Sequence, residues 1–447
     1  MEITKETIDL LLDSKRSIPI KENLSQYNPD GHKIKDKTAR PDKTVTTDKG
    51  TRSVSVSRLA LPFQKIIVDR AAAFLIGEGI ELLASPDTDQ EMLLMDMIQR
   101  TWHDTKADYK TRQLARIWMS EQEVAELWYF DEKNIWKDLG FEGKTRFRMQ
   151  TLAASLGDSL YPYFDEYGDM KAFGRGYELD KKEYMEVYTE SEKVTYINDG
   201  DWIEQDRKPN LLKKIPVVYY YRDTTEWQDV QDLIERFELM ISNFADSNDY
   251  FASPMVKIKG NVTGFAEKGE QGKLITMEEN ADASYLTWDQ APAAIQLEKD
   301  TLQELIFAMT QTPDISFKQM KGLGNISGVA LELMFLDAKL KTFKHQEEFG
   351  EGIQRRINLI RKAMTLINTS VEQAGNLHIE PKFNFYMPNN EQELVNMLTT
   401  ASGGRAIISR KTAVGLNPFV LDPEKEMEAI ADEDAAQFGN IFPEEGI

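Results

Sequence analysis

The sequence predicts an α+β protein that is mainly helical. Apolar residues recur at helical spacing over residues 61–79 and again over 227–251, whereas residues 144–222 alternate with a period close to two. A third apolar stripe of helical period runs through residues 327–368. The 447 residues are 41% hydrophobic and 10% aromatic, so we expect several domains with sizeable cores.

The first 60 residues are predicted to form an N-terminal arm. Ile20 to Val54 is polar, rich in threonine and lysine, and poor in large apolar side chains, which is typical of an extended or mobile segment. A helical layer then begins with FQKIIVDRAAAFLI, which should end at Gly77 and Gly79. A second helical block is expected over Glu91–Trp128, including SEQEVAELWYF.

A β-meander and a long helix follow this layer. Asp/Gly turns separate short alternating segments between Lys144 and Arg222, and Pro216 in IPVVYYYRD predicts an edge or strand-start position. From Trp227 onward, apolar residues recur at steps of three and four until Pro254. We therefore predict one long packed helix after the meander.

A small β module should interrupt two helices in the next part of the chain. Met255–Gln290 contains strand-like segments with glycine-rich turns, and Pro292 should open a helix that reaches Met309. The stripe from Ser327 to Asn368 predicts a helix of roughly 60 Å. Gly350 and Gly352 are the candidate kink positions in that helix.

The chain is acidic, but its charge is unevenly distributed. Lys plus Arg total 54 and Asp plus Glu total 75, which gives a formal charge of −21 and would repel nucleic acid on average. Residues 31–58 nevertheless carry eight Lys or Arg, whereas residues 422–447 carry nine carboxylates and only Lys425. Any contact with DNA must therefore be local. Before the acidic end, KFNFYMP predicts a strand, and three short helices or turns follow it into the acidic end, with Ser409 and Asp422 as caps.

Several classes of protein are excluded or disfavoured. The absence of cysteine excludes disulfides and thiolate chemistry, and no apolar run or leader predicts a membrane span or a secretory signal. No hydrolase or kinase motif is present, so we expect neither an enzyme nor a cofactor or metal. The acidic run DSND lacks the glycine and distal glutamate of a calcium loop. Four histidines in unrelated contexts are predicted to be ordinary surface residues: His32, His103, His345 and His378.

The stretch GLGNISGVALELMF joins a glycine-containing loop to the long helix. The spacing of Gly322, Gly324 and Gly328 is G-x-G-x-x-x-G, which differs from the dinucleotide fingerprint, and no Gly-Lys-Ser/Thr follows as in a P-loop. A flexible loop that ends in a helix cap at Asn325 or Ser327 is the simpler reading.

The order of these features resembles that of tailed-bacteriophage portal proteins. The similar stretches include FQKIIVDRAAAFLIGEGIEL, IPVVYYYRD with the following long helix, TPDISFKQMKGLGNISGVALELMF, and AIISRKTAVGLNPFVLDPEKEMEAI. Together with FNFYMPNN they cover most of Leu61–Ile430, and their order and spacing are more specific than any single stretch.

The resemblance implies a portal fold and a ring oligomer of about twelve subunits. It divides the chain into an N-terminal arm, a wing, two stem helices around a small clip, a tunnel loop, a long wing helix with a strand, and a short crown. The arm would be residues 1–60 and the wing 61–224. The stem helices would be residues 225–253 and 291–309, with the clip at 254–290 between them. The tunnel loop would be residues 310–328, the long wing helix and strand 329–388, and the crown 389–447.

The resemblance also implies a function. A portal ring occupies one capsid vertex, passes double-stranded DNA during genome packaging and ejection, and docks the terminase large subunit and head–tail adaptor; other partners would be major capsid and scaffolding proteins. It would be assembled in the host bacterial cytoplasm and reside in the virion. The expected channel-lining residues are Lys318, Gln319, Lys321, Gly322, Gly324 and Asn325. The alternative is a structural adaptor or scaffolding protein that passes no DNA.

Overall fold

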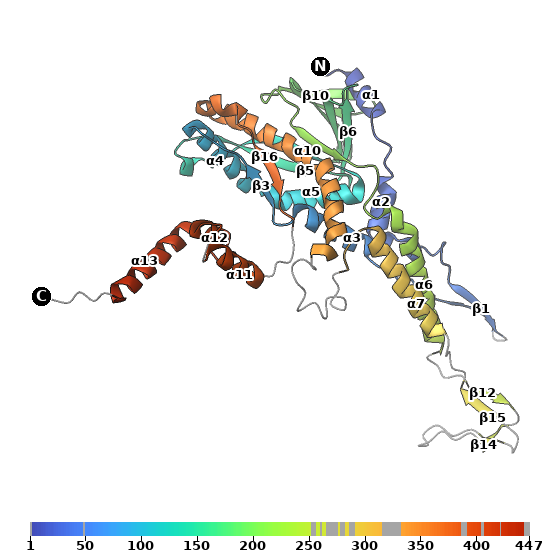
Figure 1. The fold of residues 1–447 in the computed structure, drawn as a ribbon. Helices are drawn as coiled ribbons and strands as arrows, with labels where there is room; N and C mark the ends of the chain where they lie inside the picture. Colours follow the sequence, from blue (N-terminus) through green and yellow to red (C-terminus); the bar gives the residue numbers. More distant parts are fainter. Residues whose placement is uncertain are drawn as a thin grey trace. The chain divides into compact units, whose positions relative to one another are not determined.

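The computed structural model contains two units, formed by Met1–Asp314 with Asp337–Phe385 and by Ile315–Leu336 with Tyr386–Ile447. Figure 1 shows helices and strands mixed along the chain, as the sequence predicts. The structure describes residues 2–47, 50–251, 256–259, 262–264, 276–277, 282–285, 291–314, 332–385, 391–403, 406–420 and 422–441.

The N-terminal region is more ordered than the sequence predicts. Helix α1 (Lys5–Asp13) is followed by α2 (Ile20–Tyr27) and by an antiparallel hairpin of β1 (Lys43–Thr47) and β2 (Gly50–Val54). The prediction of an extended arm over residues 20–54 is therefore wrong for α2 and for the two 3-10 turns that follow it. Sequence composition missed them because buried hydrogen bonds, such as Asn23 to Gln122 at 2.8 Å, hold this polar segment to the body.

The predicted helical layer consists of α3 (Phe63–Ile76), α4 (Asp89–Asp104) and α5 (Ala107–Glu121). The second predicted block is thus divided into two helices, with Lys106 at a left-handed φ of 54° between them. The predicted end of α3 is confirmed, because Gly77 adopts a φ of 44° that favours glycine. The expected helix does not extend over VAELWYF. Gln122, with a φ of 71°, ends α5, and strand β4 (Glu123–Glu132) begins. Aromatic and β-branched side chains on a buried strand outweigh the helical pattern there.

The predicted meander is confirmed as antiparallel sheets. Five strands form one sheet in the order β10-β9-β8-β7-β6, and three form another in the order β11-β4-β5. Pro216 directly precedes β11 at the edge of its sheet, as predicted. Helix α1 packs on the five-stranded sheet through Ile8 and Leu11. The remaining strand bounds are β3 (Ile80–Leu83), β5 (Thr145–Leu152), β6 (Asp158–Phe164), β7 (Met170–Leu179), β8 (Lys182–Tyr188), β9 (Glu192–Asn198), β10 (Trp202–Pro209) and β11 (Val217–Tyr221).

Two long helices lie side by side after the sheets (Figure 1). Helix α6 (Gln231–Phe251) and helix α7 (Ala291–Met309) are joined by an ion pair at 2.5 Å between Arg236 and Glu298. This confirms both predicted helices; Pro254, the predicted stop, lies outside the described residues. The described residues of the module between them form short strands, as predicted, namely β12 (Val256–Lys259), β13 (Val262–Gly264), β14 (Thr276–Met277) and β15 (Asp282–Tyr285). Of these, β13 lies outside the predicted segments MVKIKG, GKLITM and SYLTWDQ, and much of the second and third segments lies outside the described residues.

A segment that we call the strap (residues 32–47 and 50–61) follows one face of α6. The backbone N–H groups of Ser57, Leu59 and Leu61 donate to side chains of that helix at 2.7, 3.0 and 2.7 Å. Their acceptors Asp246, Ser242 and Glu238 recur at steps of four and therefore share a helix face. The eight Lys and Arg of residues 31–58 thus include several that lie beside acidic α6 residues.

Helix α10 (Leu336–Ile367) is the predicted long helix, although residues 327–331 of the predicted range lie outside the described part of the chain. Its second half is buried in the core through Phe349, Ile353, Ile357, Ile360 and Met364. The candidate kink glycines lie within the continuous helix. A Cβ at position 352 would lie 2.1 Å from a ring carbon of Tyr220, so glycine permits close contact there. Strand β16 (Glu380–Phe383) then pairs with β3.

The second unit contains the three predicted short helices, α11 (Glu391–Ser402), α12 (Arg410–Gly415) and α13 (Pro423–Ile441). Both predicted caps are confirmed. The Ser409 hydroxyl accepts the N–H of Thr412 at 3.1 Å, and the Asp422 carboxylate accepts the N–H groups of Glu424 and Lys425 at 3.2 Å.

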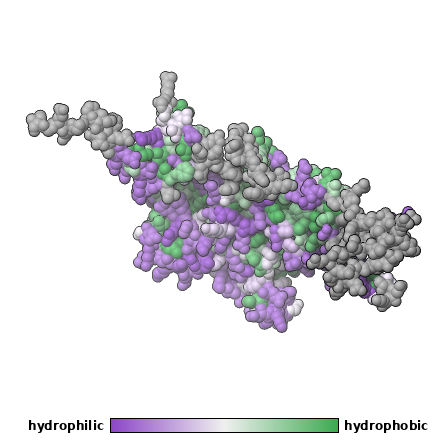
Figure 2. All heavy atoms as spheres, turned by 90° about the horizontal axis from the view of Figure 1, so that it is seen from below, coloured by the Kyte–Doolittle hydropathy of each residue, from purple (hydrophilic) through white to green (hydrophobic). Residues whose placement is uncertain are grey.

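The described surface is predominantly hydrophilic in the view of Figure 2, with hydrophobic side chains scattered among polar ones. None of the described helices combines the length and the apolar character that crossing a membrane requires.

Candidate functional site at the ends of the predicted loop

The six predicted channel-lining residues all lie outside the described residues. Lys318, Gln319, Lys321, Gly322, Gly324 and Asn325 fall within 315–331, between α7 and the helical residues that precede α10. The structure does describe the point at which α7 ends, at Met309–Asp314. The candidate site is therefore the set of groups that fixes this end, which we call the loop anchor (Thr310–Pro313 with Arg70 and Lys341).

Helix α7 ends in a left-handed turn at a residue other than glycine. Gln311 adopts a left-handed φ of 50°, and the N–H of Thr312 reaches back to the carbonyl of Phe307 at 2.9 Å. The Thr310 hydroxyl donates to the carbonyl of Ile306 at 2.8 Å. Thr310 and Thr312 are both about 5% exposed, so the chain leaves the helix from a packed position.

Two cations from different helices bind the carbonyl groups at this end. Arg70 of α3 donates to the carbonyl of Pro313 at 2.7 Å, and its guanidinium lies 5.0 Å from the ring centre of Phe307. Lys341 of α10 donates to the carbonyl of Thr310 at 2.5 Å. Cations suit this place because the last carbonyls of a helix lack partners within the helix and carry partial negative charge. The loop anchor thus connects α7 with α3 and α10.

A buried carboxylate holds Lys341 in place. Glu226 forms ion pairs with Lys341 and with Arg222 at 2.6 Å, lies 3.3 Å from His345, and has a side chain that is 1% exposed. Burial acts to raise the pKa of Glu226, but the nearby His345, Lys341 and Arg222 outweigh it and hold the pKa well below its ordinary value. Glu226 is therefore a carboxylate at neutral pH and fixes the cation that reaches the end of α7.

Two of the four histidines are buried, so the prediction of surface residues is wrong for them. His345 packs edge-on against Trp118 at 5.7 Å between ring centres, beside Glu226. His32 lies in the strap, with Nδ1 2.6 Å from Glu238 and Nε2 2.7 Å from the carbonyl of Gln26. In both cases the partner carboxylate is distant in sequence, so local context gave no signal. The other two, His103 and His378, are exposed as predicted.

A second buried ion pair fixes α10 farther along its length. Arg356 donates to Glu126 of β4 at 2.6 and 2.9 Å and to the Thr111 hydroxyl at 2.6 Å, and both charged side chains are 0% exposed. Trp128 and Tyr220 also donate to the same carboxylate. Burial, followed by the charge of Glu126, raises the pKa of Tyr220 well above its ordinary value, so the hydroxyl stays protonated. The only sequence signal for this pair is a charge placed within an apolar stripe.

Comparison with known proteins places the chain in a family. Residues 13–438 match the family model described as "Phage portal protein, SPP1 Gp6-like". The chain belongs to this family of phage portal proteins. It is 22% identical over 413 residues to the portal protein of Bacillus phage SPP1, and the match covers 87% of this chain and 79% of that protein. The predicted resemblance is confirmed, and family membership indicates a structural role in the phage particle.

Two solved structures are also similar to this portal protein. One is the neck of an empty gene transfer agent (GTA) particle, with a TM-score of 0.44, and the other is the virion of a native GTA particle, with a TM-score of 0.39. Each is 11% identical in sequence and covers 79% of this chain and 88% of the other chain.

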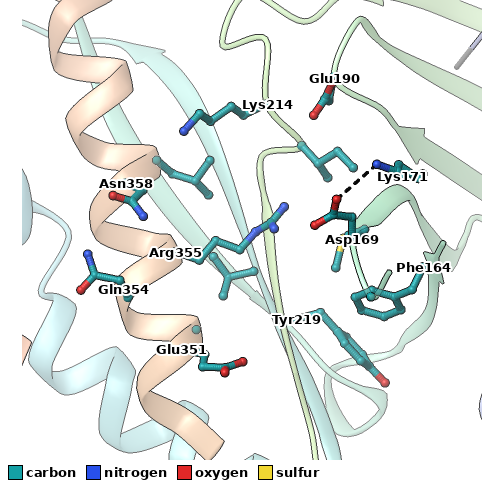
Figure 3. A pocket seen from close by; sticks show the side chains of 16 residues that line it. Phe164, Asp169, Lys171, Glu190, Lys214, Tyr219, Glu351, Gln354, Arg355 and Asn358 are labelled. Atoms are coloured by element: carbon teal, nitrogen blue, oxygen red, sulfur yellow. Dashed lines mark hydrogen bonds and ion pairs between the residues drawn. The ribbon is translucent and has the colours of Figure 1, made fainter. Parts of the chain in front are cut away.

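This portal protein also carries an open groove of about 670 Å³ between α10 and the β-sheets. Figure 3 shows Arg355 of α10 directed toward Asp169, which pairs with Lys171 at 3.5 Å. Burial, followed by the charges of Arg361, Arg355 and Lys362, lowers the pKa of Lys214 at one end of the groove. The lining mixes both signs of charge with amides, and no group of metal-ligating side chains occurs among the described residues. The groove gives no indication of a reaction.

Proposed function

We propose that the protein forms a ring, of about twelve subunits, at one capsid vertex and provides a channel for genome packaging and ejection. The observation that carries the proposal is family membership over residues 13–438. The paired helices α6 and α7, the β module between them and the long α10 support it, because they follow in the order expected of stem, clip and wing helix.

The loop after α7 is proposed to line the channel. Its N-terminal end is fixed by Arg70 and Lys341. Gly322 and Gly324 would let the loop shift as DNA passes, because glycine adopts many backbone conformations. Lys318 and Lys321, repeated around a ring, would meet DNA phosphates. The net charge of −21 would keep those contacts weak enough for DNA to slide. Gln319 and Asn325 would complete this polar surface.

The β module between α6 and α7 is proposed to dock the terminase large subunit during packaging and the head–tail adaptor afterwards. The wing would contact the major capsid and scaffolding proteins, and the crown would comprise residues 389–447. We propose assembly in the host cytoplasm and residence in the virion.

The first experiment is negative-stain microscopy with native mass spectrometry of the purified protein, with and without scaffolding and capsid proteins. Rings with a central hole support the proposal. A chain that stays small even with those partners present contradicts ring assembly.

The second experiment tests passage of DNA. The variant Lys318→Ala with Lys321→Ala should form rings and enter capsids, yet package or retain several-fold less DNA, because the proposed phosphate contacts are removed. The matched control replaces two exposed lysines of the sheet, Lys182→Ala with Lys208→Ala, and should package normally. Unchanged packaging by the loop variant contradicts the role of these lysines. Rings in capsids that never carry DNA through them would instead support the adaptor alternative.

A further inference from the structure

The hairpin of β1 and β2 has two chemically different faces. Directly opposed residues of an antiparallel pair share a face, and the register pairs Lys43 with Val54 and Val45 with Arg52. One face therefore carries two valines and two cations. The other face carries only hydroxyl side chains at its opposed pairs, which are Thr44 with Ser53 and Thr46 with Thr51.

On the valine and cation face both valines are exposed, and Lys43 lies 3.8 Å from Asp246 of the same chain with its side chain 67% exposed. Val45 and Val54 are 37% and 38% exposed, and the described residues of both strands are exposed at nearly every position. The hydroxyl face suits water, whereas the other combines apolar surface with charge. A two-stranded hairpin is marginally stable by itself and gains when such a face is covered. The pattern is that of a surface that contacts a partner.

The base of the hairpin is firmly held, so the hairpin is presented in a defined direction. Arg40 donates to Asp246 and to Asn243 of α6, both at 2.8 Å. Arg58 donates to Asp42 at 2.7 Å and to the carbonyl of Arg40 at 2.6 Å. These contacts join the segment that precedes β1 to the segment that follows β2, and they join both to α6. The hairpin itself extends beyond them.

Helix α7 offers a complementary stripe. Leu297 is 70% exposed, and Asp300, Glu304 and Ala308 on the same side are also exposed, whereas Ile306 on the opposite side is fully buried. The stripe thus joins apolar surface to two carboxylates, which matches valines beside two cations. From residue 293 to residue 308 it spans about 22 Å of helix, enough for a five-residue strand of about 16 Å.

The strap and helix α7 contact different faces of α6. The strap contacts the α6 face that contains Glu238, Ser242 and Asp246. Lys33 of the strap also pairs with Glu235, whereas the next residue, Arg236, pairs with α7. Successive helix residues are about 100° apart, so α7 contacts a different face of α6. Complementary surfaces at different places on one chain form head-to-tail contacts, which close into a ring when the rotation between successive subunits permits it.

We propose that the Lys43, Val45, Arg52 and Val54 face of each hairpin docks on the α7 stripe of the neighbouring subunit, with the cations beside Asp300 and Glu304. The occupant of the stripe is thus a second copy of this chain. This inference rests on the proposed ring. It adds to that proposal a specific contact between the N-terminal region of one subunit and the stem helix of the next.

The chain contains no cysteine, so disulfide trapping can test the contact without background. Two singly substituted chains, Arg52→Cys and Asp300→Cys, are co-assembled, purified as rings and oxidised mildly. A covalent heterodimer on a non-reducing gel must then come from two subunits. The matched control, Thr46→Cys with Asp300→Cys, places the thiol on the hydroxyl face of the same hairpin and should yield at least several-fold less heterodimer.

A charge exchange provides a second measurement. Arg52→Glu should lower the salt concentration at which rings dissociate, and Asp300→Lys in the same chain should restore it. Rings that form but give equal cross-linking from both hairpin faces, or none, overturn the docking contact and leave the ring intact. Failure of the unsubstituted chain to form rings with its partners overturns the proposed function, and the docking contact with it.

Discussion

The second half of α10 and the strap along α6 are both held by ion pairs, but in opposite surroundings. On α10, Arg356 and Glu126 are both 0% exposed and share three further hydrogen-bonded groups. On α6, the pair between Lys33 and Glu235 at 3.1 Å has side chains that are 70% and 32% exposed. The two contacts differ in burial and in geometry, because Arg356 donates to Glu126 through two nitrogens whereas Lys33 makes a single contact with Glu235.

This difference separates a fixed part of the molecule from an adaptable one. A buried charge without its partner destabilises the fold strongly, so Arg356 and Glu126 constrain where α10 crosses β4. Water can replace the partner of an exposed charge at little cost. Within the strap, the contacts of His32 with Glu238 and of Arg40 with Asp246 are largely buried and hold its base. Exposed charges such as Lys33 and those of the hairpin beyond this base can therefore change partners at little cost in the folded chain.

The largest effect is expected from Arg356→Ala. This variant leaves Glu126 buried among Trp128 and Tyr220 without its cation, so the free energy of unfolding should fall by about 3–5 kcal/mol. Urea unfolding followed by circular dichroism measures it. The neighbouring Arg355→Ala is the control, because Arg355 donates only to the backbone carbonyl of Val217 among the described hydrogen bonds.

A double substitution separates the net contribution of the Arg356–Glu126 pair to stability from the cost of burying one partner alone. Replacing both partners, Arg356→Leu with Glu126→Leu, should recover a large part of the loss, because no unpaired charge is then buried. If Arg356→Ala were no worse than Arg355→Ala, the contrast between buried and exposed pairs would be wrong.

An intermediate effect is expected at the loop anchor from Glu226→Gln. A neutral amide facing Lys341, His345 and Arg222 should cost about 2–3 kcal/mol near neutral pH, because hydrogen bonds to charged groups are lost. The folded pKa of Glu226 lies well below its ordinary value of 4.5. The stability that its charge contributes is therefore complete above that value and is lost as the pH falls through the folded pKa.

The melting temperature of both forms, measured from about pH 6 to about pH 3, tests this sign. The original protein should melt at the higher temperature near pH 6, and the difference between the two forms should shrink as the pH falls. A difference that stays constant or widens on acidification would show that Glu226 is not held as a charged group.

Much of the fold could be predicted because its signals are local. Capping at Ser409 and Asp422, the glycine end of α3 and the edge position of Pro216 each depend on neighbouring residues. The strand over VAELWYF could not be distinguished from a continued helix, because pairing with β5 and β11, which are distant in sequence, decides it. The order of α2 likewise depends on Gln122, about a hundred residues away.

The candidate site was less accessible to such reasoning. Sequence placed Lys318 and Lys321 in a loop by resemblance, and their role stays a proposal. It did not reveal Glu226, Lys341 and Arg70, because a carboxylate in TTEWQ and a lysine in a helix look like surface residues until the fold brings them together. Buried ion pairs are formed by residues distant in sequence, so periodicity cannot find them.

The smallest effect is expected from Lys33→Ala on the strap. Its pair with Glu235 lies in high dielectric, and ordering a long side chain offsets the attraction, so the free energy of unfolding should change by less than about 1 kcal/mol. Arg40→Ala is the matched comparison on the same strap. Its side chain and that of Asp246 are each 13% exposed, so its removal should cost more. Urea unfolding of both variants therefore tests burial within one segment, and a larger loss for Lys33→Ala would show that position along α6, rather than burial, determines the strength of these contacts.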